Sequence, residues 1–436
     1  MGQNTQGTTE GQCFSDISPT QAPLFAKIIV IPMENNPHRD IISPDGIRHL
    51  RFALPQAPKG CSVSDAVRPA LGAFDNPRGL TVLVNDPQRH TGTAAVLEEI
   101  ARHVDPAGIR VLVACGSHTF GRDARAAFER DLGRSMGGRS LETVAWHDCR
   151  SRQLACLGDA WMCHRWLLET RPLLAVGSVE PHYFAGFTGA HKTATIGVAA
   201  YRDIERNHAH ALGDDCRPCL LAGNPVYEGV ANMLWTLMAR RPLAVVNLVQ
   251  AGADVIAAYG GEPFATLTAA AATAEQAFAR RADGPADALI ADVSGPLGRS
   301  FYQADKGIKN SEHAVRDGGC IVLRAPCDDG IGQAAFVDLL TEAPTHRQAA
   351  DIVASRGYRL GDHKAVRLRH LTDPASRNVK VFLVSPGISQ AEANVLGLTK
   401  APDTLSALRQ AGVDPHRQRV YEIEDAGNHC LLPKSS

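Results

Sequence analysis

The stretch GLTVLVND, residues 79–86, opens the part of the sequence that decides the fold. It is an apolar run bounded by glycine and aspartate, which is typical of a buried strand. A helical pattern, TAAVLEEIARHV (93–104), separates it from a second apolar run, IRVLVACGS (109–117). A helix at 123–133 and a strand at 141–148 repeat the pattern. Strands that alternate with helices predict parallel strands joined by right-handed crossovers.

The alternation continues to the end of the chain with one interruption. The Gly/Pro-rich stretch DGPAD (283–287) breaks it, and we expect a domain boundary there. Before the break we predict strands at 173–179 and 242–250 and helices at 231–241 and 267–282. After it we predict strands at 286–295, 320–326, 379–387 and 419–425, and helices at 309–319, 336–343 and 403–412.

The predicted fold class is therefore α/β, with two α/β domains, mainly parallel sheets and an interdomain cleft. We expect an N-terminal domain over 21–282, a C-terminal domain over 283–415, and a tail over 416–436 that packs back on the N-terminal domain.

The first residues carry weaker signals. Residues 1–20 are low in hydrophobicity, which predicts disorder. The apolar run 24–33 predicts a strand, and 62–74 predicts a helix with Ser64 as its N-cap.

Composition excludes several classes of function. The 436 residues are 44% hydrophobic and 21% charged, and their formal net charge of −1 recruits neither nucleic acid nor an anionic membrane. We find no apolar run of about 18 residues and no signal peptide at the polar start, so we expect a cytoplasmic protein. Eleven cysteines, an odd number, indicate reduced thiols.

The richest stretch in reactive side chains is 177–210, which directly follows a predicted strand. It contains His182, Lys192 and His208. Loops at the carboxyl ends of parallel strands form the ligand crevice of open α/β sheets, so these side chains are candidates for a site. Gly186 and Gly189 indicate a tight turn or a close approach of the backbone to a ligand.

Two further strand ends carry candidates. Arg89 follows the strand 79–86 and suits a carboxylate or phosphate, although taken alone it is more simply explained as a solvated loop arginine. His118 follows the strand 109–117, where the alternative is a hydrogen-bonded structural histidine. Together with His182 it places two imidazoles on either side of one ligand. That arrangement suits an enzyme acting on both stereoisomers of a substrate.

Other motifs leave alternatives open. Tyr302 and Lys306, four residues apart, could bind a carboxylate or simply begin a solvated helix. Zinc is a competing interpretation, since a four-coordinate site could be built from His208, His210, Cys216 and Cys219. An NAD-dependent dehydrogenase is disfavoured because no GxGxxG follows a predicted strand.

The motifs DxxR, GSH, PHYFAGFTGxxK, NH, GNPV and FYQADK, in this order over residues 75–430, resemble the lactate racemase family. Members use the nickel-pincer nucleotide, a pyridinium-3-thioamide-5-thiocarboxylic acid mononucleotide of nickel, which cofactor-biosynthesis proteins make. The resemblance implies a thioamide link at Lys192, a nickel ligand at His208, acid–base roles for His118 and His182, and a cofactor and substrate pocket lined by Asp86, Arg89, Tyr302, Gln303 and Lys306.

The chemistry fits these residue types. Removing the α-proton of a 2-hydroxy acid is difficult beside a carboxylate, whereas removing hydride requires an electrophilic cofactor. A histidine on each face then takes the hydroxyl proton of either enantiomer. Thr119 and His90 stand where the family has arginine and proline, which predicts a roomier, more polar site. We therefore expect a racemase or epimerase for a 2-hydroxy acid larger or more polar than lactate, the alternative being a non-catalytic or zinc-binding homologue.

Overall fold

The structure is a computed structural model that describes residues 40–434 except 138 and 159, and all of these lie in one compact unit. The predicted disorder at 1–20 and the predicted strand at 24–33 lie outside the described residues.

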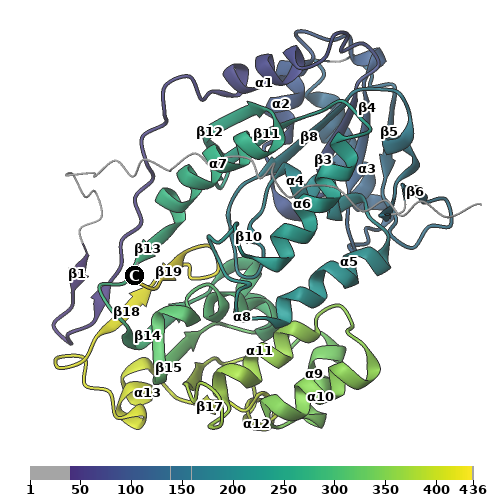
Figure 1. Cartoon of the computed structure of the whole chain (residues 1–436). Coiled ribbons are helices and arrows are strands. Elements are labelled where there is room, and N and C mark those ends of the chain that lie inside the picture. The colour runs from purple at the N-terminus through teal and green to yellow at the C-terminus, as the bar shows by residue number, and fades with distance from the viewer. Residues whose placement is uncertain (1–39, 138, 159, 435–436) are drawn as a thin grey trace, which may run out of the picture. The chain divides into compact units, whose positions relative to one another are not determined.

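The first sheet has six strands and carries the first series of predicted strands (Figure 1). All neighbours pair in parallel except β11 and β12, which are antiparallel. Their spatial order is β12 (Asp254–Gly261), β11 (Leu243–Ala251), β8 (Leu173–Ser178), β3 (Thr81–Asn85), β4 (Arg110–Ala114) and β5 (Thr143–Trp146).

Helices pack on both faces of this sheet. Val82 and Val84 of β3 lie in a core shared with α1 and α2, whereas Leu83 lies in a core shared with α4, α5 and α6. A strand buried on both faces is apolar at successive positions, which explains its continuous apolar run. The helices are α1 (Val63–Gly72), α2 (Thr93–Ile100), α3 (Arg122–Arg134), α4 (Ala190–Thr193), α5 (Tyr201–His208), α6 (Pro225–Met238) and α7 (Pro263–Phe278).

The second sheet has seven strands, parallel except for the pair β1 and β2. Its order is β1 (Ile41–Ile42), β2 (Arg48–His49), β18 (Val420–Ile423), β14 (Ala286–Asp292), β15 (Val315–Arg324), β16 (Lys380–Val384) and β17 (Thr399–Lys400). Its helices are α8 (Phe301–Lys309), α9 (Ala334–Glu342), α10 (His346–Arg356), α11 (Asp362–Thr372), α12 (Gln390–Leu396) and α13 (Thr404–Ala411).

Short elements complete the chain. Three pairs of strands are β6 (Ala155–Leu157) with β7 (Trp161–Cys163), β9 (Pro181–His182) with β10 (Gly186–Phe187), and β13 (Ala279–Arg281) with β19 (Cys430–Leu432). The 3-10 turns are η1 (Pro87–Arg89), η2 (Pro106–Gly108), η3 (Arg165–Leu168), η4 (Ile196–Val198), η5 (Ala209–Leu212), η6 (Gly295–Arg299) and η7 (Glu312–Ala314).

The mainly parallel α/β architecture is confirmed, but the strand pairing departs from the predicted domain ranges. Strands β1 and β2 belong to the second sheet although they lie within 21–282. In the tail, β18 pairs with β14 and β2 in the second sheet, whereas β19 pairs with β13. Pairing between distant segments leaves no local trace in the sequence. The division into two domains otherwise stays a prediction.

Three local predictions are wrong. The helix expected at 267–282 ends at Phe278, and Ala279–Arg281 form β13. The helix expected at 309–319 is instead the end of α8, the turn η7 and the start of β15. Lys309 is fully buried and its Nζ lies 2.7 Å from Oε2 of Glu312, so these two charged side chains form an internal ion pair. The N-cap of α1 is Ser62 and not Ser64, because Ser62 and Asp65 form a capping box.

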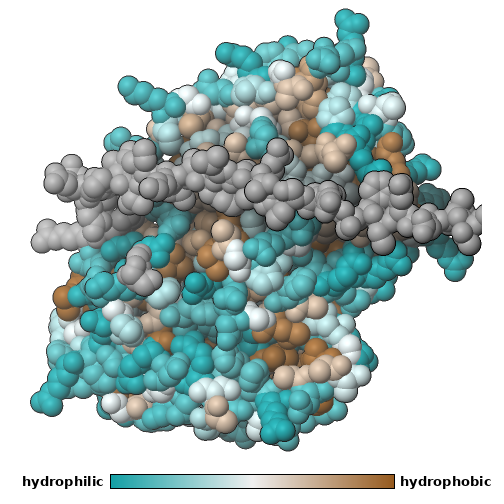
Figure 2. Space-filling view, viewed as in Figure 1, coloured by the Kyte–Doolittle hydropathy of each residue, from teal (hydrophilic) through white to brown (hydrophobic). Residues whose placement is uncertain are grey.

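Among the described residues, no helix is both long enough and apolar enough to span a membrane. Figure 2 shows hydrophilic residues over most of the described surface on the face in view, with smaller groups of hydrophobic residues between them. Scattered apolar side chains of this kind are ordinary on a folded protein.

Candidate functional site

The candidate site lies where the strand order of the first sheet reverses. The chain runs from β3 to β4 and β5 on one side, then returns to β8 on the other side of β3. The loop after β3 carries Asp86 and Arg89, the loop after β4 carries His118, and the segment after β8 carries His182. Because β8 and β4 flank β3, the two histidines leave strands on opposite sides of the Asp86–Arg89 loop. Such a switch point is the usual ligand crevice of a doubly wound sheet.

A cavity of about 140 Å³ occupies this position. That is room for several water molecules or a small ligand. Six of the nine predicted site residues line it, namely Asp86, Arg89, His118, His182, Lys192 and His208. Motifs that were grouped only by their resemblance to a family therefore lie around one cavity.

The three predicted residues of α8 do not line this cavity. Gln303 is exposed, while Tyr302 and Lys306 are partly buried. Lys306 lies within electrostatic range, since its charge contributes to the lowered pKa values of His182 and Lys192. The lining residues all fall within 85–208, so the predicted placement in an interdomain cleft is not reproduced by this cavity.

Thr119 and His90, which suggested a roomier and more polar site, are both exposed and do not line the cavity. His90 adopts a left-handed conformation (φ 49°) at the end of η1, which directs the chain out of the turn. These two residues therefore give no support to the expectation of a substrate larger or more polar than lactate.

His118 is oriented by Asp86. Its Nδ1 lies 2.9 Å from Oδ2 of Asp86, whose other oxygen accepts the N–H of Gln88 (2.9 Å). Asp86 is 4% exposed, and the side chain of His118 is 37% exposed. A carboxylate only accepts hydrogen bonds, so Nδ1 carries a proton, and the neutral form of the ring has its lone pair on Nε2. The structure thus gives Asp86 a role that the sequence did not reveal.

His182 has a different environment. It is buried, and its Nδ1 accepts the N–H of Ala185 (3.3 Å). Burial, followed by the charges of Lys192 and Arg89, lowers the pKa of His182 well below its ordinary value. The neutral ring that keeps the bond to Ala185 carries its proton on Nε2. The two histidines therefore have opposite tautomers.

Lys192 is held at the start of a short helix by close backbone packing. Gly189 precedes α4 with φ 145°, and Asn247 Oδ1 accepts the N–H of Ala190 (2.9 Å). Gly186 is also in the left-handed region (φ 73°), which confirms the expected tight turns. Burial, followed by the cations Arg89 and Lys306, lowers the pKa of Lys192 to about 7. A large share of the amine is therefore neutral and nucleophilic at neutral pH.

Gly177 of β8 allows this approach of α4 to the sheet. A Cβ at residue 177 would lie 2.4 Å from the backbone nitrogen of Ala190, which cannot move independently of α4. We therefore expect Gly177→Ala to lower the free energy of unfolding by about 2 kcal/mol or more through overpacking. Thermal unfolding measures this effect, and Gly121→Ala, with open space around its Cβ, is the control. Equal melting temperatures for the two variants would contradict the close approach.

His208 ends α5 and faces the same cavity. Its Nδ1 is buried without a hydrogen-bond partner among the described residues, and its ring lies 5.1 Å from that of Phe184. Burial, followed by the charge of Lys192, lowers the pKa of His208 to about 3. The ring is neutral at physiological pH, which is the form that binds a metal.

The zinc alternative is not supported by the geometry. No group of three or more His, Cys, Asp or Glu side chains within the described residues is placed to hold a metal ion. His210 is exposed, because residues two apart at a helix end point in different directions. The thiol of Cys216 donates to the carbonyl oxygen of His210 (3.1 Å) instead of facing the His208 ring.

Sequence reasoning missed several polar residues of the cavity. Thr193 donates to Oδ1 of Asn85 at 2.8 Å, and both residues line the cavity together with Ser117. Asn85 and Ser117 directly follow apolar runs, so their position at strand ends was the signal that could have identified them.

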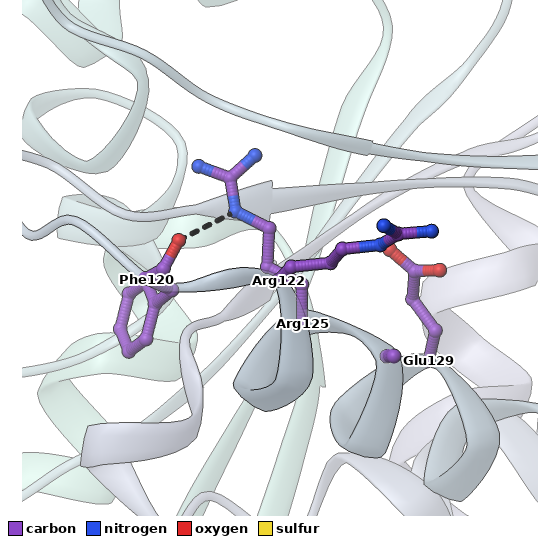
Figure 3. Close-up of a pocket in the computed structure, with 5 residues that line it drawn as sticks. Phe120, Arg122, Arg125 and Glu129 are labelled. Atoms are coloured by element: carbon purple, nitrogen blue, oxygen red, sulfur yellow. Dashed lines mark hydrogen bonds between the residues drawn. The ribbon is translucent and has the colours of Figure 1, made fainter.

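A second hollow of about 420 Å³ lies on α3 beside the His118 loop (Figure 3). Phe120, Arg122, Arg125, Ala126 and Glu129 line it, and Nε of Arg125 donates to the carbonyl oxygen of Phe120 (3.0 Å). The ring of Phe120 also contacts the edge of His118, with ring centres 6.4 Å apart. This hollow contains none of the predicted site residues, and its contacts brace the His118 loop.

Profiles of known families match two parts of this chain. The profile of the lactate racemase N-terminal domain matches residues 68–217, and that of the lactate racemase C-terminal domain matches 281–415. The lactate racemase of Thermoanaerobacterium thermosaccharolyticum is 28% identical over 275 residues, and that of Lactiplantibacillus plantarum is 24% identical over 274 residues. Each alignment covers 60% of this chain and 62% of the relative, which is less than two thirds of the relative's length.

Solved structures share the fold. The lactate racemase apoprotein of Thermoanaerobacterium thermosaccharolyticum matches with a TM-score of 0.72 and 22% identity, covering 88% of this chain and 97% of that one. A protein from Thermotoga maritima matches with a TM-score of 0.64 and 16% identity, covering 88% of this chain and 100% of that one. At these identities the matches bear on the fold alone.

Proposed function

Because the chain belongs to the lactate racemase family, we propose that it is a racemase or epimerase of a 2-hydroxy acid that uses the nickel-pincer nucleotide. One observation carries the proposal: His118, His182, Lys192 and His208 line a single cavity at the switch point of the first sheet. Paired acid–base groups, an amine for covalent attachment and a metal ligand are the groups that this chemistry needs.

The residues present fit the cofactor. Lys192, with its pKa lowered to about 7, offers the neutral amine that a covalent link requires. His208 offers a neutral imidazole whose Nδ1 is buried without a hydrogen-bond partner among the described residues. When bound, the cofactor would supply the electrophilic carbon that accepts hydride, which no side chain supplies. Cofactor-biosynthesis proteins are the partners that this proposal requires.

The two histidines divide the proton chemistry. His118 presents the lone pair of Nε2, because its Nδ1 is bonded to Asp86, so it is placed to take the substrate hydroxyl proton. His182 lies on the other side of the loop that follows β3 and presents Nε2–H. It is therefore placed to donate a proton to the oxygen of the planar keto acid. Conversion of one enantiomer adds a proton to His118 and removes one from His182, and the opposite enantiomer reacts from this reversed protonation state, which exchange with solvent resets. Arg89, beside them, is suited to hold the substrate carboxylate.

Asp86→Asn tests the orientation of His118. We expect kcat to fall about 100-fold, because a neutral amide no longer favours the proton on Nδ1. Asp105→Asn is the matched control, since Asp105 caps η2 through the N–H of Ala107 as Asp86 caps η1 through that of Gln88. If the two variants have the same kcat, Asp86 does not orient the base.

Reactivity of Lys192 is expected to rise as pH increases through about 7, because only the neutral amine is nucleophilic. Between about pH 6 and pH 8 the neutral fraction of a group with this pKa increases about tenfold. Acetylation by acetic anhydride, measured at Lys192 by peptide mass spectrometry at equal exposure to the reagent, checks this. A rise of about 100-fold over this range, the increase expected for an ordinary lysine, would contradict the lowered pKa.

The activity itself is tested on protein produced together with cofactor-biosynthesis proteins. Single enantiomers of several 2-hydroxy acids, lactate included, are incubated with the protein and separated by chiral chromatography. We expect at least one acid to give both enantiomers. Cofactor-loaded protein that interconverts none of the acids would contradict the proposed function.

A further inference from the structure

Packing against two aromatic neighbours holds the ring of His182. Its side chain has one hydrogen bond among the described residues, the 3.3 Å bond from Ala185. The ring stacks on Tyr183 with centres 5.2 Å apart and planes 13° apart, and it lies nearly perpendicular to the ring of Phe184 with centres 4.4 Å apart. A single hydrogen bond of this length holds the orientation of the ring only weakly. The orientation of His182 therefore depends on Tyr183 and Phe184.

Helix α11 of the second sheet fixes these two neighbours. Nε2 of His363 lies 3.0 Å from the hydroxyl of Tyr183, and the ring of His363 lies 4.9 Å from that of Phe184. Arg367, one turn further along α11, donates to the carbonyl oxygen of Tyr183 (3.5 Å). Tyr183 is 7% exposed and His363 is 3% exposed, so water does not compete for their bond.

The neighbours of His363 determine which nitrogen donates. The hydroxyl of Tyr358 accepts the N–H of Gly361 (3.4 Å) and lies 2.7 Å from Nδ1 of His363. We assign the proton of Tyr358 to the bond with Nδ1, so that the neutral ring donates Nε2–H to Tyr183. Both nitrogens are engaged and His363 does not line the cavity, so it exchanges no proton with a substrate there.

We propose that His363 is a positioning residue that holds Tyr183, and through it the ring of His182, in the orientation required at the cavity. The inference rests on the proposed function, in which His182 moves the hydroxyl proton of the substrate. Through this contact, helix α11, which belongs with the second sheet, orients an acid–base residue that follows a strand of the first sheet. Displacement of a reacting group by about 1 Å costs about 100-fold in rate, so a remote contact of this kind has a measurable effect.

Kinetics of cofactor-loaded protein test this positioning role, with the 2-hydroxy acid that the wild type interconverts fastest. We expect Tyr183→Phe and His363→Leu each to lower kcat about tenfold and to leave KM within about twofold, because substrate binding is intact. The double variant should be no slower than the slower single variant, since both substitutions remove the same bond between Tyr183 and His363. Tyr259→Phe, which loses a hydroxyl bond to Thr273 outside the site, is the control and should keep wild-type kcat.

Rescue by a hydrogen-bonding substitution distinguishes a positioning role of His363 from a role in packing alone. His363→Gln places an amide N–H near the position of Nε2 and should restore kcat to within about threefold of the wild type, whereas His363→Leu should not. A kcat for His363→Leu within twofold of wild type, losses that multiply in the double variant, or equal losses in the Gln and Leu variants would each overturn the inference.

A measurement without turnover keeps the inference distinct from the proposed function. In protein labelled with ¹⁵N-histidine, the ring signals of His182, assigned by their loss in His182→Gln, should shift in Tyr183→Phe and His363→Leu but not in Tyr259→Phe. Unchanged signals would overturn the positioning role. Loaded wild-type protein that interconverts no hydroxy acid, with the signals shifting as expected, would overturn the proposed function instead.

Discussion

Lys192→Ala is expected to abolish covalent retention of the cofactor and to lower racemisation below detection. The amine is the one group at this cavity with both the nucleophilicity and the position for a covalent link, since its pKa is lowered to about 7 beside the neutral ring of His208. Without the link, coordination by His208 alone would have to hold the cofactor. Intact-protein mass spectrometry reports the lost mass directly, before any assay of activity.

The matched control is Lys364→Ala. Lys364 is also a buried lysine, and burial lowers its pKa to about 8, but it does not line the cavity. We expect this variant to lose stability and to keep the full added mass. If the Lys192→Ala protein kept the added mass, or if Lys364→Ala lost it, the assignment of the covalent link to Lys192 would be wrong.

His118→Gln and His182→Gln are expected to have the second largest effect. Each should lower kcat about 1000-fold, because general acid–base catalysis contributes about 10²–10⁴-fold and both directions of the reaction need both groups. The added mass at Lys192 should remain. Because the equilibrium constant of the reaction does not change, kcat/KM must fall by the same factor from either enantiomer.

His147→Gln is the control for loss of a histidine in the same half of the chain. His147 is buried and its Nε2 bonds the carbonyl oxygen of Ala199, but the ring does not line the cavity. We expect a lower melting temperature with kcat close to wild type. Retention of more than about a tenth of wild-type kcat in either the His118 or the His182 variant would remove the paired acid–base mechanism.

The first sheet could be predicted from the sequence because its strands are buried on both faces. Such strands are apolar at successive positions, as in Thr81–Asn85 and Arg110–Ala114, and the helices between them show a helical period. The antiparallel strand Asp254–Gly261 escaped prediction because glycines and a partly exposed pattern interrupt it. The pairing of Arg48–His49 with Val420–Ile423 joins chain ends that are far apart in sequence, and no local pattern reports such a contact.

The sequence identifies those residues of the candidate site that lie at strand ends or within motifs. His118 and His182 each follow an apolar run, so the sequence places both at one edge of the sheet. The Asp86–His118 bond and the Tyr183–His363 bond join residues from different segments, and only the fold brings them together. The zinc alternative is unsupported for a related reason, since proximity of His208 and His210 in sequence does not make them face one point.

The central claim is that a 2-hydroxy acid loses and regains its C2 hydrogen as hydride while two histidines move the hydroxyl proton. Cofactor-loaded wild-type protein in ordinary water, given one enantiomer of the 2-hydroxy acid that it interconverts, deuterated at C2, tests this directly. We expect the opposite enantiomer, isolated by chiral chromatography, to keep its deuterium in the mass spectrum. Replacement of that deuterium by solvent hydrogen would show removal of an α-proton and would contradict hydride transfer.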